Sequence, residues 1–113
     1  YKVNIQQKID TGYIFSMVDS MPTFIGGNDS LFTFLQTNLH YVDNSEGRVI
    51  ALFIIEKDGS ITNIKIQKGL NEKADNEVIR VLNLMPEWNP GIHFGELVRV
   101  RMAIPINFKT KKN

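Results

Sequence analysis

Six apolar residues on a single parity near the end of the chain constrain the fold more than any other feature. An extended strand turns alternate side chains to opposite faces, so these residues predict one long strand with one buried face. They are Val98, Val100, Met102, Ile104, Ile106 and Phe108. The other parity is wetter and includes Pro105, whose missing amide fits the edge of a sheet rather than its centre.

Two more strands are expected before it, joined by a tight turn. Residues 48–56 are apolar at nearly every position, which favours a central strand covered on both faces. Residues 61–68 alternate apolar and polar side chains, which predicts a half-exposed strand. The sequence Lys57-Asp58-Gly59-Ser60 between them is typical of a hairpin turn in which Gly59 supplies a positive φ.

Two amphipathic helices flank this hairpin. The first follows the bend at Gly26-Gly27, has polar residues at positions 28–30 that can cap it, and repeats leucine at positions 31, 35 and 39. The second is expected to be capped by Asn71, and its apolar stripe runs to Met85 before Pro86 stops it.

The element order, helix–strand–strand–helix–strand, predicts an α+β fold. A strand–helix–strand unit takes a right-handed crossover that leaves its two strands parallel. The apolar strand at 48–56 then belongs between them, which gives a three-stranded antiparallel sheet in the order second–first–third. Both helices are expected on one face of this sheet. The last strand, at 97–108, becomes an edge with a row of unpaired amides and carbonyls.

These elements make one domain at residues 21–108. Residues 1–20 form an extended lead-in, whose apolar run at 13–18 is either an edge strand or an arm laid over the core. Residues 109–113 form a basic tail, expected to be a solvated end. Because the chain opens at Tyr1 rather than methionine, it is expected to be a processed or excised piece, with any signal peptide or membrane anchor outside it.

The edge strand is the predicted partner-binding site. Its candidate residues are Val98, Arg99, Val100, Arg101, Met102, Ala103, Ile104 and Ile106. Arg99 and Arg101 either hold acidic groups of a partner beside the edge or solvate its outer face and keep it from aggregating. An exposed edge of this kind also permits pairing with a second copy as a homodimer.

The single tryptophan lies in the loop before the last strand, between Pro86 and Pro90. Trp88 is interpreted as a structural plug at the end of the core. The alternative is an exposed aromatic anchor for a partner.

Residues suited to catalysis are few. The chain has no cysteine, which excludes disulfides, thiolate zinc sites and cysteine nucleophiles. Histidine is the residue type best suited to acid–base chemistry near neutral pH, but His40 and His93 lie in separate segments and belong to no metal-ligand or nucleophile motif. The pair Gly26-Gly27 lacks the further glycine and the lysine of a phosphate loop. We therefore predict no enzyme, metal or cofactor, and the net charge of +1 gives no reason to expect nucleic acid.

Several motifs in a fixed order resemble the TonB C-terminal domain family, in the form common in Bacteroidetes. They are a lead-in of proline, an aromatic and two glycines, a valine strand followed by an aspartate-glycine turn, and a tryptophan loop between prolines. The matching residues are Met21-Pro22-Thr23-Phe24-Ile25-Gly26-Gly27, Gly47-Arg48-Val49, Lys57-Asp58-Gly59-Ser60-Ile61, Met85-Pro86-Glu87-Trp88-Asn89-Pro90-Gly91, Gly95 and Ile104-Pro105-Ile106-Asn107-Phe108. The chain departs from the family at Tyr41-Val42, where a tyrosine-proline pair is frequent.

The resemblance implies a periplasmic domain tethered in its parent protein to the inner membrane. TonB proteins carry energy from the proton-motive force to outer-membrane transporters, and their inner-membrane proton-channel partners would contact an N-terminal region outside this sequence. They bind a short extended segment of the transporter, the TonB box, by adding it as a strand to the domain's edge. The family's binding edge is the last strand, the same strand that the topology leaves unpaired. The alternative is a related periplasmic module of another membrane-anchored protein, such as a sensor or a peptidase, with a different ligand.

Overall fold

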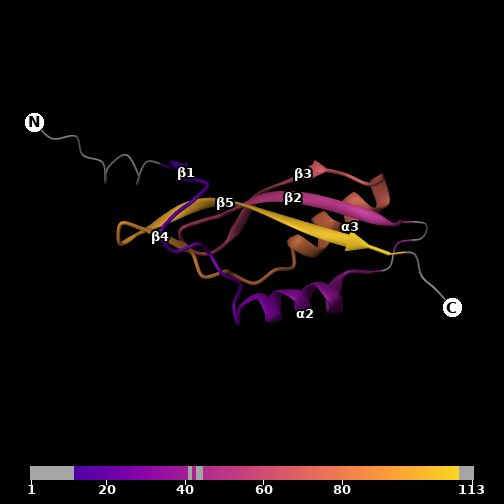
Figure 1. Cartoon of the computed structure of the whole chain (residues 1–113), viewed down its shortest axis with the longest axis horizontal. Helices are drawn as coiled ribbons and strands as arrows, with labels where there is room; N and C mark the ends of the chain where they lie inside the picture. The colour runs from indigo at the N-terminus through magenta and orange to yellow at the C-terminus, as the bar shows by residue number, and fades with distance from the viewer. Residues whose placement is uncertain (1–11, 41, 43–44, 110–113) are drawn as a thin grey trace, which may run out of the picture.

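The computed structural model describes residues 12–40, 42 and 45–109 (Figure 1). Predictions for the first half of the lead-in, for Tyr41 and for the end of the basic tail fall outside these residues. The described elements are β1 (Ile14–Phe15), α2 (Asn28–Asn38), β2 (Gly47–Ile55), β3 (Ile61–Lys68), α3 (Glu72–Leu82), β4 (Gly91–His93) and β5 (Glu96–Phe108). Neither helix in these ranges has the length and apolar character needed to cross a membrane.

The described strands form a mixed five-stranded sheet, where the sequence predicted three antiparallel strands. The three long strands lie in the order β5-β2-β3 with β2 antiparallel to both neighbours, so their predicted order is confirmed. Two short strands join the first half of β5: β1 pairs with it in parallel and β4 pairs with it antiparallel (Figure 1). The three-strand prediction is wrong because these additions are too short to leave an alternating pattern in the sequence.

A two-residue turn, Phe94-Gly95, joins β4 to β5. The φ angles of Phe94 and Gly95 are 52° and 77°, and two positive values are the mark of a type I′ hairpin turn. Glycine adopts this conformation without steric cost, whereas Phe94 accepts some strain and leaves its ring 68% exposed. The hairpin was not predicted because an Asn-Gly or Asp-Gly pair, its usual sequence signal, is absent.

The lead-in is both an edge strand and a cover, so the two alternatives left open by the sequence occur together. Ile14 and Phe15 pair with Arg99 and Val100 of β5. Phe15 then packs, with Val18 and Met21, on the buried pair Val98 and Val100. The packed unit therefore begins before residue 21.

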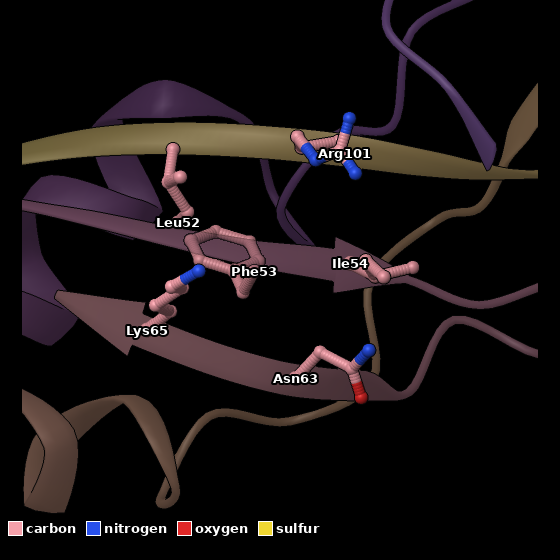
Figure 2. Close-up of a pocket in the computed structure, with 6 residues that line it drawn as sticks. All are labelled: Leu52, Phe53, Ile54, Asn63, Lys65 and Arg101. Carbon is pink, nitrogen blue, oxygen red and sulfur yellow. The ribbon is translucent and has the colours of Figure 1, made fainter. Parts of the chain in front are cut away.

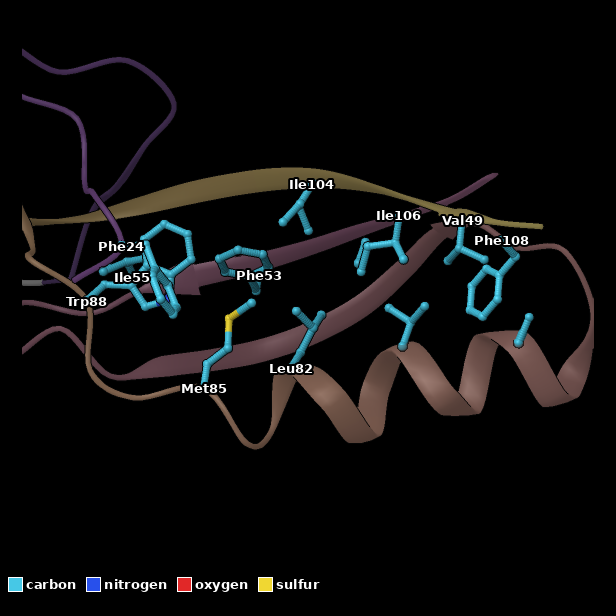
Figure 3. Packing of buried hydrophobic residues seen from close by; sticks show 13 residues of the cluster. Phe24, Val49, Phe53, Ile55, Leu82, Met85, Trp88, Ile104, Ile106 and Phe108 are labelled. Atoms are coloured by element: carbon cyan, nitrogen blue, oxygen red, sulfur yellow. The ribbon is translucent and has the colours of Figure 1, made fainter. Parts of the chain in front are cut away.

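The main core lies between the sheet and the two helices. Figure 3 shows the part of it between the sheet and α3. One face of the sheet supplies alternate residues from β2 and β5, namely Val49, Ala51, Phe53, Ile55, Ile104, Ile106 and Phe108. Helix α3 packs on them through Ala74, Val78 and Leu82, and helix α2 packs through half-buried residues that include Leu31 and Leu35. Both helices pack against this one cluster, so they lie on the same side of the sheet.

The helix-free face of β2 is only partly covered, which corrects the prediction of a strand buried on both sides. Ile50 and Leu52 are half-buried on this face, while Ile54 is 4% exposed. Branched apolar residues have a high β propensity, so they are also common on strands that are only half-buried. Apolar residues on both faces of β2 therefore did not require a covering layer on each face.

The helix ends differ in how well the sequence predicted them. Asn71 caps α3 as predicted, because its side chain accepts a hydrogen bond from the backbone N–H of Ala74 at 2.8 Å. Helix α3 ends at Leu82, earlier than the predicted end at Met85. Helix α2 begins after Gly27, which offers no side-chain cap, rather than after a polar residue at 28–30.

Candidate functional site

Strand β5 has two halves with different surroundings on the side away from β2. Residues Val100 to Phe108 pair with β2 along its whole length. The first half of β5 pairs in addition with β4, at Glu96 to Val98, and with β1, at Arg99 and Val100. From Arg101 onward, β2 lies on one side and no strand in the described part of the chain lies on the other.

The backbone of this second half is oriented for further pairing. Pro105 lies opposite Ile50 in the ladder with β2, and it has no amide to give to that ladder. A proline in a sheet is accommodated where its nitrogen faces the open side. Backbone groups alternate in direction along an antiparallel strand, so Arg101, Ala103 and Asn107 also direct their N–H and C=O groups outward. We call residues 101–108 the open edge.

The side chains of the open edge divide between two environments. Ile104, Ile106 and Phe108 are buried in the core, and Met102 is half-buried beside them. Arg101, Ala103, Pro105 and Asn107 are exposed on the opposite, helix-free face. A strand added here would therefore meet an apolar layer on one face and a polar layer on the other.

Three of the predicted edge residues do not lie at the open edge. Val98 pairs with Gly91 of β4, and Val100 lies between β1 and β2 with its side chain fully buried. Arg99 also pairs with β1. The first half of the strand is covered because the lead-in folds back on it, and the weak sequence pattern of the lead-in did not predict that position.

Arg99 on β5 forms an internal ion pair with Glu56, the residue after β2, and also holds the lead-in. Its Nε and one terminal nitrogen donate to the two carboxylate oxygens of Glu56, at 2.7 and 3.0 Å. Its other terminal nitrogen donates to the backbone carbonyl of Gly12 at 2.8 Å. With its guanidinium committed in this way, Arg99 stabilises the fold, while Arg101 has no hydrogen bond or ion pair from its side chain to another described residue.

The ion pair predicts a pH-dependent stability. The Arg99 guanidinium holds the pKa of Glu56 below its ordinary value, against the opposing effect of burial, and the Thr62 hydroxyl adds to the lowering. A carboxyl group whose pKa is lowered by folding stabilises the fold above its unfolded pKa of about 4.3, and this contribution is lost as the pH falls through the folded value. We expect Glu56→Gln to lower the free energy of unfolding by about 1 to 2 kcal/mol at pH 7 and by much less at pH 3.

Urea unfolding of the natural chain and the variant at both pH values measures this difference. The matched control is Glu87→Gln, because Glu87 is exposed and has no ion pair to another described residue. A cost of Glu56→Gln that is the same at pH 7 and pH 3 would contradict the assignment.

The tryptophan loop is part of the core rather than a surface anchor. Trp88 is 5% exposed, and its ring packs against Phe24 and Phe53 with centroids 5.5 and 5.7 Å away. Its backbone N–H donates to the carbonyl of Gly59 at 2.8 Å, which ties the loop to the β2–β3 turn. Pro86 and Pro90 flank the loop, and Pro90 leads directly into β4.

The remaining motif glycines lie at tight turns or close approaches. Gly26 and Gly27 have φ angles of 89° and 90°, which permits the bend before α2. A Cβ on Gly91 would lie 2.6 Å from Cγ2 of Val100, so β4 can approach β5 closely only without a side chain there. Gly91, together with Gly95 in the turn, therefore permits the close pairing of β4 with β5.

A shallow pocket on the helix-free face was missed by sequence reasoning. It has a volume of about 200 Å³ and is lined by Leu52, Phe53, Ile54, Asn63, Lys65 and Arg101. Figure 2 shows Arg101 on β5 at one side of β2, and Asn63 and Lys65 on β3 at the other side. The alternation of side chains along each strand predicts which of these residues share the helix-free face. The pairing register of β2 with β3 and β5 decides that Lys65 and Arg101 line the same pocket.

The histidines belong to no cluster of three or more metal-ligating side chains among the described residues. His93 accepts a hydrogen bond at Nδ1 from the backbone N–H of Asp19, at 3.2 Å, and its ring packs against Phe15 and Phe94. His40 donates its backbone N–H to Glu77. Both residues thus make contacts that hold neighbouring segments together.

Comparison with known protein families assigns the chain to a family. A family model described as the C-terminal part of the Gram-negative bacterial TonB protein matches residues 43–110, which is more than half of the chain. The matched region includes β2, β3, α3, β4 and β5, and therefore the whole open edge. A search of curated proteins finds no match.

Proposed function

The chain belongs to the family of C-terminal domains of Gram-negative bacterial TonB proteins, and from this premise we propose that it is the periplasmic binding domain of a TonB-like energy transducer. In this proposal it holds the TonB box of an outer-membrane receptor, which adds as a strand to the open edge. Force generated at the inner membrane then reaches the receptor through this added strand. The observation that carries the proposal is the open edge itself.

The open edge suits strand addition in length and in chemistry. It offers eight residues, 101–108, next to a strand that is already fixed by pairing with β2. Outward backbone groups at Arg101, Ala103 and Asn107 supply hydrogen bonds that do not depend on the sequence of the ligand. The position of β1 sets one limit, because it already occupies the same side of β5 at Arg99 and Val100.

A peptide titration tests this proposal. An isotope-labelled domain is titrated with a TonB-box peptide, and the amide shifts of the domain are followed by NMR. We expect the largest shifts at the amides of residues 101–108, and small ones in α3, which packs on the far side of the sheet from the helix-free face. Shifts confined to the helices, or no shifts with box peptides from several receptors, would contradict the proposal and favour a TonB-like module with a different ligand.

A pair of variants at one position sharpens the test. Ala103→Pro removes an outward amide without removing a hydrogen bond to β2, so we expect peptide affinity to fall about 5- to 10-fold. Ala103→Ser keeps the amide and a small side chain and serves as the control, because Ala103 is exposed. The amide spectrum of each variant shows whether β2 and β5 remain paired. Equal affinity of the two variants would show that outward hydrogen bonds at this edge do not hold the peptide.

A further inference from the structure

The described segment before α2 has two parts that are held to the domain in different ways. Its second part, residues 18–23, is anchored by two β-bridges. Ser20 and Ile92 exchange two backbone hydrogen bonds of 2.9 Å, and Thr23 and Asn89 exchange two of 3.1 and 2.8 Å. This part is therefore fixed both to β4 and to the loop that precedes it.

The first part, residues 12–17, is attached by fewer contacts. Its strand, β1, has two residues and pairs with β5 in parallel, the arrangement that is slightly less stable per residue. Phe15 packs on the buried valines of β5, and the carbonyl of Gly12 accepts a hydrogen bond from Arg99 at 2.8 Å. Such a segment can separate locally while β2, β3 and β5 stay paired with one another.

An exposed bend at Ser16 and Met17 joins the two parts. Met17 is 76% exposed and packs against neither core cluster, and Ser16 is exposed as well. A change of backbone angles at this bend therefore disturbs no buried side chain of its own. The bend can serve as a hinge between the anchored part and residues 12–17.

Residues 12–17 lie on the side of β5 that carries the open edge (Figure 1). Backbone groups alternate in direction along β5, so Arg99 directs its N–H and C=O groups to the same side as Arg101. There β1 pairs with β5, at Arg99 and Val100. A strand added to the open edge therefore has to stop at Arg101 while β1 is in place.

Resting on the proposed strand addition, we propose that residues 12–17 are a displaceable strap that limits the length of the open edge. When the strap swings out at the bend, the outward backbone groups of Arg99 become available and a longer segment of the peptide pairs with β5. The ion pair between Arg99 and Glu56 does not involve the strap and is kept. Closure is favoured in the free domain because release exposes the valines on which Phe15 packs. The closed strap is thus an autoinhibitory contact.

Hydrogen exchange in the free domain tests whether the strap opens by itself. The Arg99 amide faces β1, whereas Phe53 lies in the middle strand of the sheet and pairs with Met102. We expect the Arg99 amide to exchange at least about 10-fold faster than the Phe53 amide, because opening of the strap exposes only the first. Equal protection of the two amides would mean that the strap leaves only when the domain unfolds, which would overturn the inference.

A loosened strap is expected to strengthen the binding of long peptides alone. Phe15→Ser removes the packing on β5, and Met17→Ser in the same segment is the matched control. Each domain is titrated with an eight-residue TonB-box peptide and with the same peptide extended by four receptor residues at one end or the other. For Phe15→Ser, we expect the affinity of one extended peptide to rise about 3- to 10-fold, the effect of one or two added backbone hydrogen bonds, with amide shifts that reach Arg99. The eight-residue peptide is expected to bind the natural chain and both variants equally.

A second variant opens the strap without removing an apolar contact. Gly12 has a φ of 103°, whereas proline is held near −65°. Gly12→Pro therefore excludes the backbone conformation that brings the Gly12 carbonyl to Arg99. It is expected to raise the affinity of the same extended peptide, and it keeps the test decisive if Phe15→Ser does not fold.

The outcomes separate failure of this inference from failure of the proposed function. Unchanged affinity for both extended peptides in the two release variants, with shifts still present at residues 101–108, would overturn the strap and leave strand addition intact. Absence of shifts at those amides with every peptide and every variant would contradict strand addition and, with it, the regulatory role of the strap. Binding that occurs only in the release variants would support both.

Discussion

Replacing Trp88 with alanine is expected to lower the free energy of unfolding by about 3 to 5 kcal/mol, a large share of the stability of a domain of this size. The ring is 5% exposed and packs against Phe24 and Phe53. Its removal leaves a cavity at the point where the lead-in, the β2–β3 turn and the loop before β4 meet. Chemical unfolding at pH 7 measures the loss.

The substitution Trp88→Phe separates the packing of the ring from its polar group. The indole Nε1 is buried, and it has no hydrogen-bond partner in the part of the chain that the structure describes. Removing that N–H therefore breaks no described hydrogen bond, and phenylalanine keeps much of the aromatic contact. We expect Trp88→Phe to cost about 1 to 2 kcal/mol, well below the alanine variant. Equal losses for the two variants would show that the N–H, and not the packing, supplies the stability.

The long strands could be predicted from sequence because each carries its own periodic signal. The hairpin of β2 and β3 has a turn with Gly59, and β5 keeps one parity apolar from Val98 to Phe108. The order of these strands then followed from chain-level rules on crossovers. The short strands β1 and β4 have no such signal, because two or three residues cannot establish a period and their pairing is decided by contacts distant in sequence.

The candidate site was predicted only in part, because its limits depend on contacts between segments distant in sequence. Pro105 marked the strand as an edge from sequence alone, and the open edge includes it. How much of β5 is open depends on where the lead-in lies, which the sequence did not reveal. Arg99 and Arg101 are indistinguishable by pattern, yet one is held by Glu56 while the other faces the pocket. Register and long-range packing separate them, and neither is encoded locally.

Gly59→Ala is expected to cost at least about 3 kcal/mol, because it combines backbone strain with a collision. Gly59 has a φ of 88°, a conformation that costs an alanine about 1 to 2 kcal/mol. A Cβ at this position would lie 2.1 Å from the carbonyl oxygen of Trp88, a distance that requires the backbone to move. The same loop is held by the hydrogen bond from the Trp88 N–H to the Gly59 carbonyl. The turn and the tryptophan loop would have to separate, which exposes part of the core.

Gly95→Ala is the matched control, because it reproduces the strain without the collision. Gly95 has a φ of 77°, and a Cβ there would meet nothing within 4 Å. Its expected cost is therefore the conformational part alone, about 1 to 2 kcal/mol. Urea unfolding of both variants, with tryptophan fluorescence as the probe, isolates the contact between the turn and the loop as the difference between them. Equal costs would mean that Gly59 is needed only for its backbone angle. The position of the tryptophan loop, which sets where β4 begins, would then depend on other contacts.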